Sequence, residues 1–288
     1  MKAPPGFHRL ARATDGDLHE IVTLVHERTR LENTRLIPLL DNHLVCNGLH
    51  NVRPSSWRMT TGHAVARQML LDEALSAIGR VLDDASVPWV PIKGMGLPDG
   101  TYAEDEIRIT NDIDILIPHR DIAAAIGALK QSGWKAAAAG PREARYLEDE
   151  GYNWQATSPH FRAFLEVHYR LWGAVDSRLQ PALIERSLPH PRRGTHARRL
   201  SAEDSYLVAA THTFIAGRPR PFLYLVDLEK LARIADRTVL VDEVCMLAGA
   251  YDLQLLVWLA TSFSAELWGE PHRTIATRLE PSLTIWEK

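Results

Sequence analysis

Cysteine is scarce in this 288-residue chain, which contains only Cys46 and Cys245. Both lie among apolar or helix-forming neighbours, so we expect buried free thiols rather than a disulfide, as in a reducing cytoplasm. The chain also lacks the H-x-x-x-H and C-x-x-C spacings that are typical of zinc sites. Zinc catalysis is therefore not expected.

Long apolar runs are also missing. The longest, near residues 253–263, is too short to cross a bilayer, and the first 17 residues contain no apolar signal-peptide core. The formal net charge is −3, so no overall positive field attracts nucleic acid. These features predict a cytoplasmic globular protein with no membrane partner.

The stretch from Trp89 to Pro118 carries the strongest chemical signal. A short apolar strand ends at Lys93-Gly94, and after a polar loop a second strand begins with Asp112 and Asp114. Side chains alternate along a strand, so both carboxylates point to the same face. Such a pair is most easily tolerated where a divalent cation neutralises it, and oxygen ligands suit Mg²⁺ or Mn²⁺, usually bound with a polyphosphate.

A third carboxylate lies in a later predicted strand, at residues 160–169, where Phe164, Glu166 and His168 share one face. Glu166 has apolar neighbours, which is an unfavourable place for an unpartnered carboxylate. If this strand lies beside the first, three carboxylates converge, and such a site can hold two metal ions. A salt bridge to Arg162 or Arg170 is the alternative role for Glu166.

Other residues near these strands have both a functional and a structural interpretation. Lys93 and the backbone at Gly94 could contact phosphate oxygens, or Lys93 could be a surface lysine. Arg108 could neutralise a triphosphate or pair with Asp112. His168 could orient Glu166, contact substrate, or be a core histidine. His212 and Asp227 lie on predicted helices; we expect helix packing for Asp227 and leave His212 open.

The pattern along the chain predicts an α/β (α+β) fold, a small mixed sheet with helical additions at both ends. Residues 1–60 form an N-terminal helical segment, 61–190 the core and 191–288 a C-terminal helical domain. Apolar periodicity places helices at 61–84 and 120–133, a hairpin at 151–169, and a nearly continuous helical region at 201–268, broken near 217–221 and 236–238. Residues 47–56 are predicted to be a loop, residues 134–139 a short strand, and the polar residues 141–151 a loop or lid.

The motifs resemble a known superfamily. The segment Ile92-Lys93-Gly94, Arg108, Asp112-Ile-Asp114-Ile-Leu and Leu165-Glu166-Val167-His168 is similar to the uncharacterised bacterial nucleotidyltransferases of the polymerase-β-type superfamily. The resemblance implies a sheet of nucleotidyltransferase type, with Asp112, Asp114 and Glu166 as catalytic metal ligands and Lys93, Gly94, Arg108 and His168 at the nucleotide. The superfamily commonly has Gly-Ser where this chain has Lys93-Gly94, so Lys93 would share the phosphate contacts.

We therefore expect transfer of a nucleoside monophosphate from an NTP to a hydroxyl, with Mg²⁺ or Mn²⁺ and release of pyrophosphate. The acidic net charge, with only one arginine cluster (Arg192-Arg193 and Arg198-Arg199), favours a small-molecule or peptide acceptor over nucleic acid. Aromatic residues at 152, 154, 169 and 172 could line its pocket. The alternatives are a toxin-like enzyme acting on tRNA and a degenerate, non-catalytic nucleotide-binding module.

Overall fold

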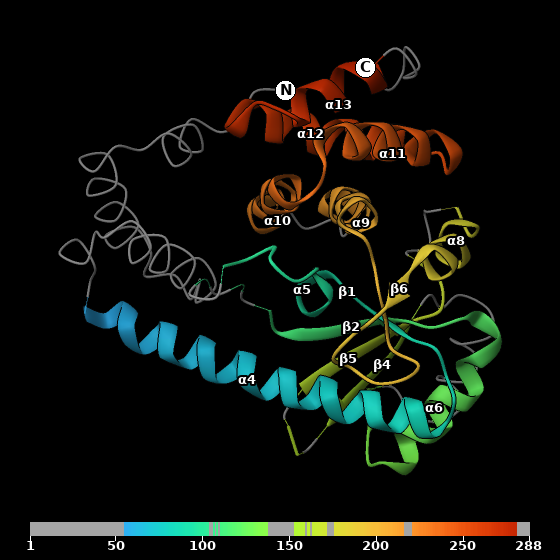
Figure 1. Ribbon diagram of the computed structural model, residues 1–288. Helices are drawn as coiled ribbons and strands as arrows, with labels where there is room; N and C mark the ends of the chain where they lie inside the picture. The colour runs from blue at the N-terminus through green and yellow to red at the C-terminus, as the bar shows by residue number, and fades with distance from the viewer. Residues whose placement is uncertain are drawn as a thin grey trace.

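The computed structural model describes residues 55–103, 106, 108, 110–137, 153–158, 160–161, 163–171, 176–215 and 221–280, which form a mixed sheet with helices on both faces (Figure 1). The strands of the main sheet are β1 (Val90–Ile92), β2 (Asp112–Leu116), β3 (Lys135–Ala136), β4 (Asn153–Ser158) and β5 (Ala163–His168). Their order is β1-β2-β5-β4-β3, and the only parallel pair is β2 with β5. The predicted mixed α+β fold is confirmed.

The helices divide into two groups around this sheet. On one face lie α4 (Ser55–Asp84) and α6 (Ile122–Gln131), which follows the short 3-10 helix η2 (His119–Asp121). The one-turn helix α5 (Lys93–Gly96) follows β1 directly. The helices on the other face of the sheet are α8 (Leu179–Arg186), α9 (Ala202–Ile215), α10 (Pro221–Ile234), α11 (Arg237–Ala250), α12 (Gln254–Trp268) and α13 (His272–Leu279).

The alternation of side chains along β2 explains which face carries the acidic residues. Ile113, Ile115 and Ile117 are fully buried in one core cluster with residues of α4 and α6. Leu116 belongs to the second cluster, built from the C-terminal helices. Because side chains alternate with a period of two, Asp112 and Asp114 share the face of Leu116. The carboxylates therefore point toward the C-terminal helical group.

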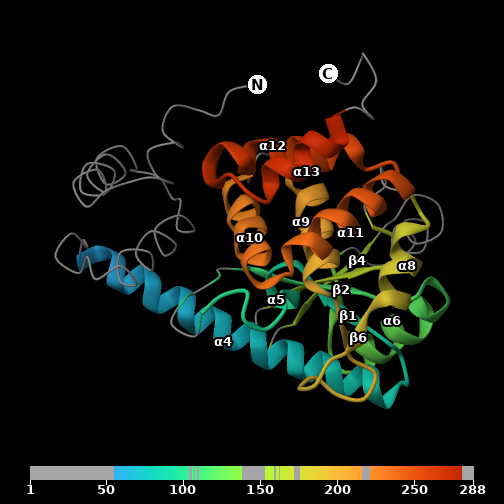
Figure 2. The same cartoon turned by 45° about the horizontal axis from the view of Figure 1, so that its top comes forward.

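Helix α9 is the centre of that group and packs against α10, α11 and α12 (Figure 2). It also contacts α5, so the helical group reaches the end of β1. A small hairpin of β6 (Leu188–Pro189) and β7 (Arg198–Arg199) lies before α9, and a bridge between Trp89 and Ala197 joins it to the segment that enters β1. The sequence pattern did not predict this hairpin.

Most predicted elements are confirmed, with three corrections. Residues 55–56 belong to α4 rather than to a loop. Within the described residues 134–137, the expected strand covers only β3. The C-terminal helical region has a break at residues 251–253 that was not predicted. The β4–β5 hairpin and the break near 236 are as expected. The expected N-terminal helices, the loop at 141–151 and most of the break at 217–221 lie outside the described residues. Among the described helices, none has the length and apolar character needed to cross a membrane.

Candidate active site

The turn after β1 has a geometry that requires its glycines. A Cβ on Gly96 would lie 2.2 Å from the carbonyl carbon and oxygen of Pro91, and one on Gly94 would lie 2.6 Å from Thr110 Oγ1. Lys93, which opens the turn, has a φ of +54°, a left-handed conformation that non-glycine residues rarely adopt. This close packing fixes the backbone of the turn and therefore the direction in which the Lys93 side chain points.

Lys93 reaches the second aspartate of β2. Its Nζ lies 2.5 Å from Asp114 Oδ1, and both side chains are at least 91% buried, with 9% and 5% exposed. Burial is the largest single influence and lowers the pKa of Lys93. The charge of Asp114 and its hydrogen bond, with Tyr224 and Glu166, together outweigh burial, so the pKa lies above its usual value. Burial likewise raises the pKa of Asp114, yet Lys93 and His168 bring it well below the usual range. The pair is therefore ionised, and Lys93 is not a surface lysine.

Strand β5 adds two more groups to the same place. The register sets Glu166 opposite Asp114, and His168 Nε2 lies 2.9 Å from Asp114 Oδ1 and 3.4 Å from Glu166 Oε2. Gln155 on β4 donates to Glu166 Oε1 at 3.1 Å. Among the described residues, the partners of Glu166 are thus Gln155 and His168 rather than Arg170. The other proposed partner, residue 162, lies outside the described residues.

One oxygen or nitrogen from each of Asp114, Glu166 and His168 lies within 4.8 Å of the others, close enough to surround one metal ion. Two carboxylates and an imidazole are suitable donors for Mn²⁺ or Mg²⁺, although imidazole is less typical of Mg²⁺. The donor set therefore fits a divalent cation. It differs from the predicted set, because it includes His168 and leaves Asp112 outside this group of three.

Asp112 lies at the start of β2, half-buried, with Oδ1 3.3 Å from Thr110 Oγ1. Burial is the main cause that raises the pKa of Asp112, followed by the Asp114 charge; Lys93 opposes both, and Glu166 adds to the rise. Both other carboxylates therefore act on Asp112 electrostatically, while the use of all three as metal ligands stays a prediction. A bound cation would relieve this repulsion.

Arg108 has a partner that the sequence did not suggest. Its Nη2 donates to Asp227 Oδ2 at 2.6 Å and its Nε to Oδ1 at 3.2 Å, so it pairs with α10 rather than with Asp112. Tyr102 donates to the same Oδ1 at 2.6 Å. Asp227 is 1% exposed, and its carboxylate raises the pKa of Arg108 although burial opposes this. The role of Asp227 is therefore more than helix packing.

Further contacts join α10 and α9 to the site. Lys230 pairs with Glu106 and lies over the Tyr102 ring, 5.6 Å from its centroid. On α9, His212 meets the Tyr224 ring edge-on at 4.7 Å. Burial, followed by the nearby Lys93 charge, lowers the pKa of His212 to about 3, so the imidazole is neutral at pH 7. His212 thus belongs to the surroundings of Lys93, which its helical position alone could not indicate.

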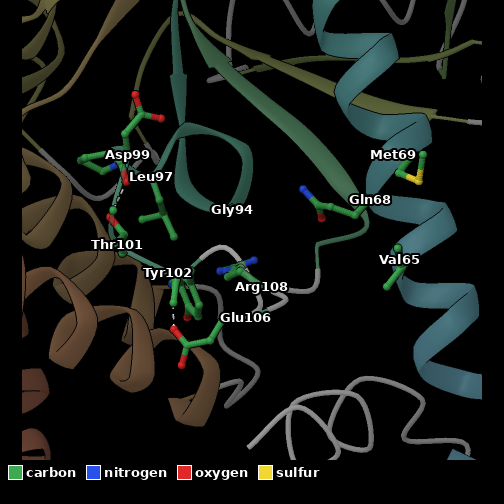
Figure 3. A pocket seen from close by; sticks show the side chains of 13 residues that line it. Val65, Gln68, Met69, Gly94, Leu97, Asp99, Thr101, Tyr102, Glu106 and Arg108 are labelled. Carbon is green, nitrogen blue, oxygen red and sulfur yellow. Dashed lines mark hydrogen bonds between the residues drawn. The ribbon is translucent and has the colours of Figure 1, made fainter. Parts of the chain in front are cut away.

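A cavity of ≈ 350 Å³ opens beside this site (Figure 3). Figure 3 shows Gln68 and Met69 of α4 on one side and Leu97, Tyr102 and Glu106 on the other. The complete lining is Val65, Gln68, Met69, Gly94, Leu97, Pro98, Asp99, Gly100, Thr101, Tyr102, Ala103, Glu106 and Arg108. The cavity therefore shares Gly94 and Arg108 with the candidate site.

Two other expectations about binding surfaces need correction. Trp154 is 2% exposed and belongs to the core on the α4 side, so it does not line a pocket beside Glu166. Tyr169, also 2% exposed, belongs to the same core cluster and lines a different cavity, together with Pro118 and Gln180. Residues 152 and 172 lie outside the described residues. In the arginine cluster, Arg192 pairs with Asp99 and Arg193 with Asp72. These ion pairs neutralise part of the cluster within the chain.

The fold and the motif arrangement are those of the nucleotidyltransferase class. The chain belongs to the family described as uncharacterised nucleotidyltransferases, whose model matches residues 29–269, and nucleotidyl transfer is the general activity of that class. No curated protein matches the chain. Among solved structures it is similar to the antibiotic-resistance factor ANT(2'')-Ia, with 13% identity, 65% of this chain and 91% of that chain covered, and a TM-score of 0.41.

Proposed function

We propose that the protein transfers a nucleoside monophosphate from an NTP to a hydroxyl of a small-molecule or peptide acceptor and releases pyrophosphate. The observation that carries the proposal is the placement of Asp112, Asp114 and Glu166 on one face of two parallel neighbouring strands, beside the Lys93-Gly94 turn. Membership of the nucleotidyltransferase family supports the general reaction. The acceptor and the metal requirement are parts of the proposal.

The carboxylates and His168 would hold Mg²⁺ or Mn²⁺, which, when bound, neutralises negative charge on the triphosphate. The acceptor oxygen attacks the α-phosphorus, the bond to the β-phosphate oxygen breaks, and pyrophosphate leaves. Glu166, whose side chain is 20% exposed, is the candidate to take the hydroxyl proton or to complete the metal ligands. Its contacts with Gln155 and His168 hold it in place.

Lys93 and Arg108 supply positive charge near the reacting phosphates. The absence of a side chain at Gly94 lets Thr110 and the Arg108 guanidinium pack closely against the backbone of the turn. Arg108 is already paired with Asp227, so its net field is reduced, and its second role is to hold the Tyr102 segment against α10. His168 keeps the Asp114 and Glu166 carboxylates together.

The cavity supports a small acceptor. It adjoins Gly94 and Arg108, and its volume of ≈ 350 Å³ is within the range of sites for small ligands. Leu97 and Met69 offer apolar contacts. Gln68 Oε1 is buried and has no hydrogen-bond partner among the described residues, so it can accept from a hydroxyl or amine of the acceptor. The internal pairing of Arg192 and Arg193 gives no added support to a tRNA acceptor.

The test is a label-transfer assay. Purified protein is incubated with each α-³²P-labelled NTP and Mg²⁺ or Mn²⁺, in separate reactions with a small-metabolite extract and with total tRNA. We expect pyrophosphate release and label in a small product. Label on RNA would favour the toxin-like alternative and overturn the small-acceptor choice.

A non-catalytic nucleotide-binding module is the second candidate. The observation in its favour is that Lys93 already occupies an oxygen of Asp114, in place of the Gly-Ser pair common in the superfamily. Binding of an NTP without pyrophosphate release in any acceptor pool would support this role. Release that depends on Asp112 would exclude it.

A further inference from the structure

The position of the Lys93 ammonium bears on how many metal ions the site can bind. We propose that Lys93 takes the place of one of the two cations of a two-metal site, so that this site works with a single divalent cation. The inference rests on the proposed function, because it concerns the same carboxylates. It changes the expectation of two ions that the sequence suggested.

The first argument is the stereochemistry of Asp114. Lys93 Nζ at 2.5 Å and His168 Nε2 at 2.9 Å both contact the same oxygen, Oδ1. A carboxylate that bridges two metal ions offers one oxygen to each ion. With Oδ1 held by an ammonium group, Asp114 retains Oδ2 for one ion. In a two-metal site, Asp114 would offer Oδ1 to the second ion. The Lys93 ammonium group occupies that oxygen instead.

The second argument is that Lys93 is built into this position. The residue has a φ of +54°, its side chain is 9% exposed, and the following turn allows no Cβ at Gly96 because of the Pro91 carbonyl. A buried ammonium that left Asp114 would lose its counter-charge, which is strongly unfavourable. Lys93 is therefore a fixed cation rather than a mobile surface charge.

The third argument is size and charge. The donor atoms of Asp114, Glu166 and His168 lie within 4.8 Å of one another, which suits one ion, whereas a second ion would lie about 3.5–4 Å from the first. When Asp112, Asp114 and Glu166 are ionised, Lys93 leaves two negative charges, which one divalent cation balances.

The experiment counts bound Mn²⁺ by electron paramagnetic resonance. Wild type, K93Q and the control K135Q, which changes an exposed lysine on β3, are titrated with Mn²⁺ alone and with each non-hydrolysable α,β-methylene NTP analogue. Glutamine is uncharged and shorter than lysine, so it removes the ammonium group from Asp114 Oδ1. Thermal melts verify that each variant is folded.

We expect one Mn²⁺ per chain in wild type and K135Q, and two in K93Q. Two ions in wild type, or equal counts in wild type and K93Q, would overturn the inference, and the wild-type count decides even if K93Q does not fold. If wild type binds an analogue together with two ions, the single-cation inference fails, but the proposed nucleotidyl transfer stands. If no analogue binds, the proposed function fails, while the titration with Mn²⁺ alone still compares the two variants.

Discussion

Replacing Asp227 with asparagine removes the charge that holds Arg108 inside the protein. The two side chains are 1% and 9% exposed and meet in a two-point contact, with Tyr102 as a third partner. Asparagine keeps the size and one acceptor, so the main change is that the buried Arg108 guanidinium loses the negative charge of Asp227. Breaking a buried ion pair in this way costs about 3–5 kcal/mol.

That loss is large against a total stability of about 5–15 kcal/mol. In a chain of this size it corresponds to a fall in Tm of roughly 6–20 °C, at 2–4 °C per kcal/mol. Urea unfolding followed by circular dichroism measures the free energy directly. The matched control is D242N, which breaks the exposed pair with Arg278 and is expected to cost less than about 1 kcal/mol.

The double variant R108M/D227N completes the test. Methionine and asparagine leave no buried charge, so its stability is expected to exceed that of D227N alone. A loss below about 1 kcal/mol in D227N would refute the reasoning, because such a value is typical of an exposed pair. Equal stability of D227N and D242N would refute it in the same way.

Two further perturbations test the packing and the electrostatics. G96A places a Cβ against the Pro91 backbone and is expected to lower the free energy of unfolding by about 1–3 kcal/mol. The control is G127A on α6, where a Cβ meets nothing within 4 Å, and it is expected to raise that free energy by about 0.5–1 kcal/mol. An unchanged stability of G96A would contradict the close approach to Pro91. Burial raises the pKa of Glu229, but its hydrogen bonds with His272 and Arg233 outweigh this and lower the pKa below 4.5. Its contribution to stability is therefore present above pH 4.5 and lost as the pH falls through the folded-state value. E229Q is expected to be less stable than wild type at pH 7 and to lose less stability than wild type on acidification. The control is E266Q, which changes an exposed glutamate. Parallel curves of stability against pH for E229Q and wild type would contradict the assignment.

The local parts of the site were predictable because they follow from short-range pattern. Alternation along β2 placed Asp112 and Asp114 on one face, and the spacing of the β4–β5 hairpin placed Glu166 and His168 together. The β-branched and apolar residues of these strands also identified them as buried. These inferences need only the period of a strand and the residues of a turn.

The long-range partners were not predictable. Arg108 and Asp227 are 119 residues apart, and no periodicity relates a loop residue to one position on a distant helix. The break between α11 and α12, at residues 251–253, contains neither glycine nor proline, so the usual signal was missing. Trp154 was expected in a pocket and lies in the core because aromatic residues on a strand suit either place.

The central claim is that the β2 carboxylates carry out nucleotidyl transfer. Label transfer from α-³²P-NTP, measured side by side for wild type and D112N, tests it most directly. Asp112 is half-buried, and its side chain accepts a long hydrogen bond from Thr110, so D112N is expected to melt within a few degrees of wild type. The account predicts labelled product with wild type and none above background with folded D112N. Equal labelling by the two proteins would contradict it.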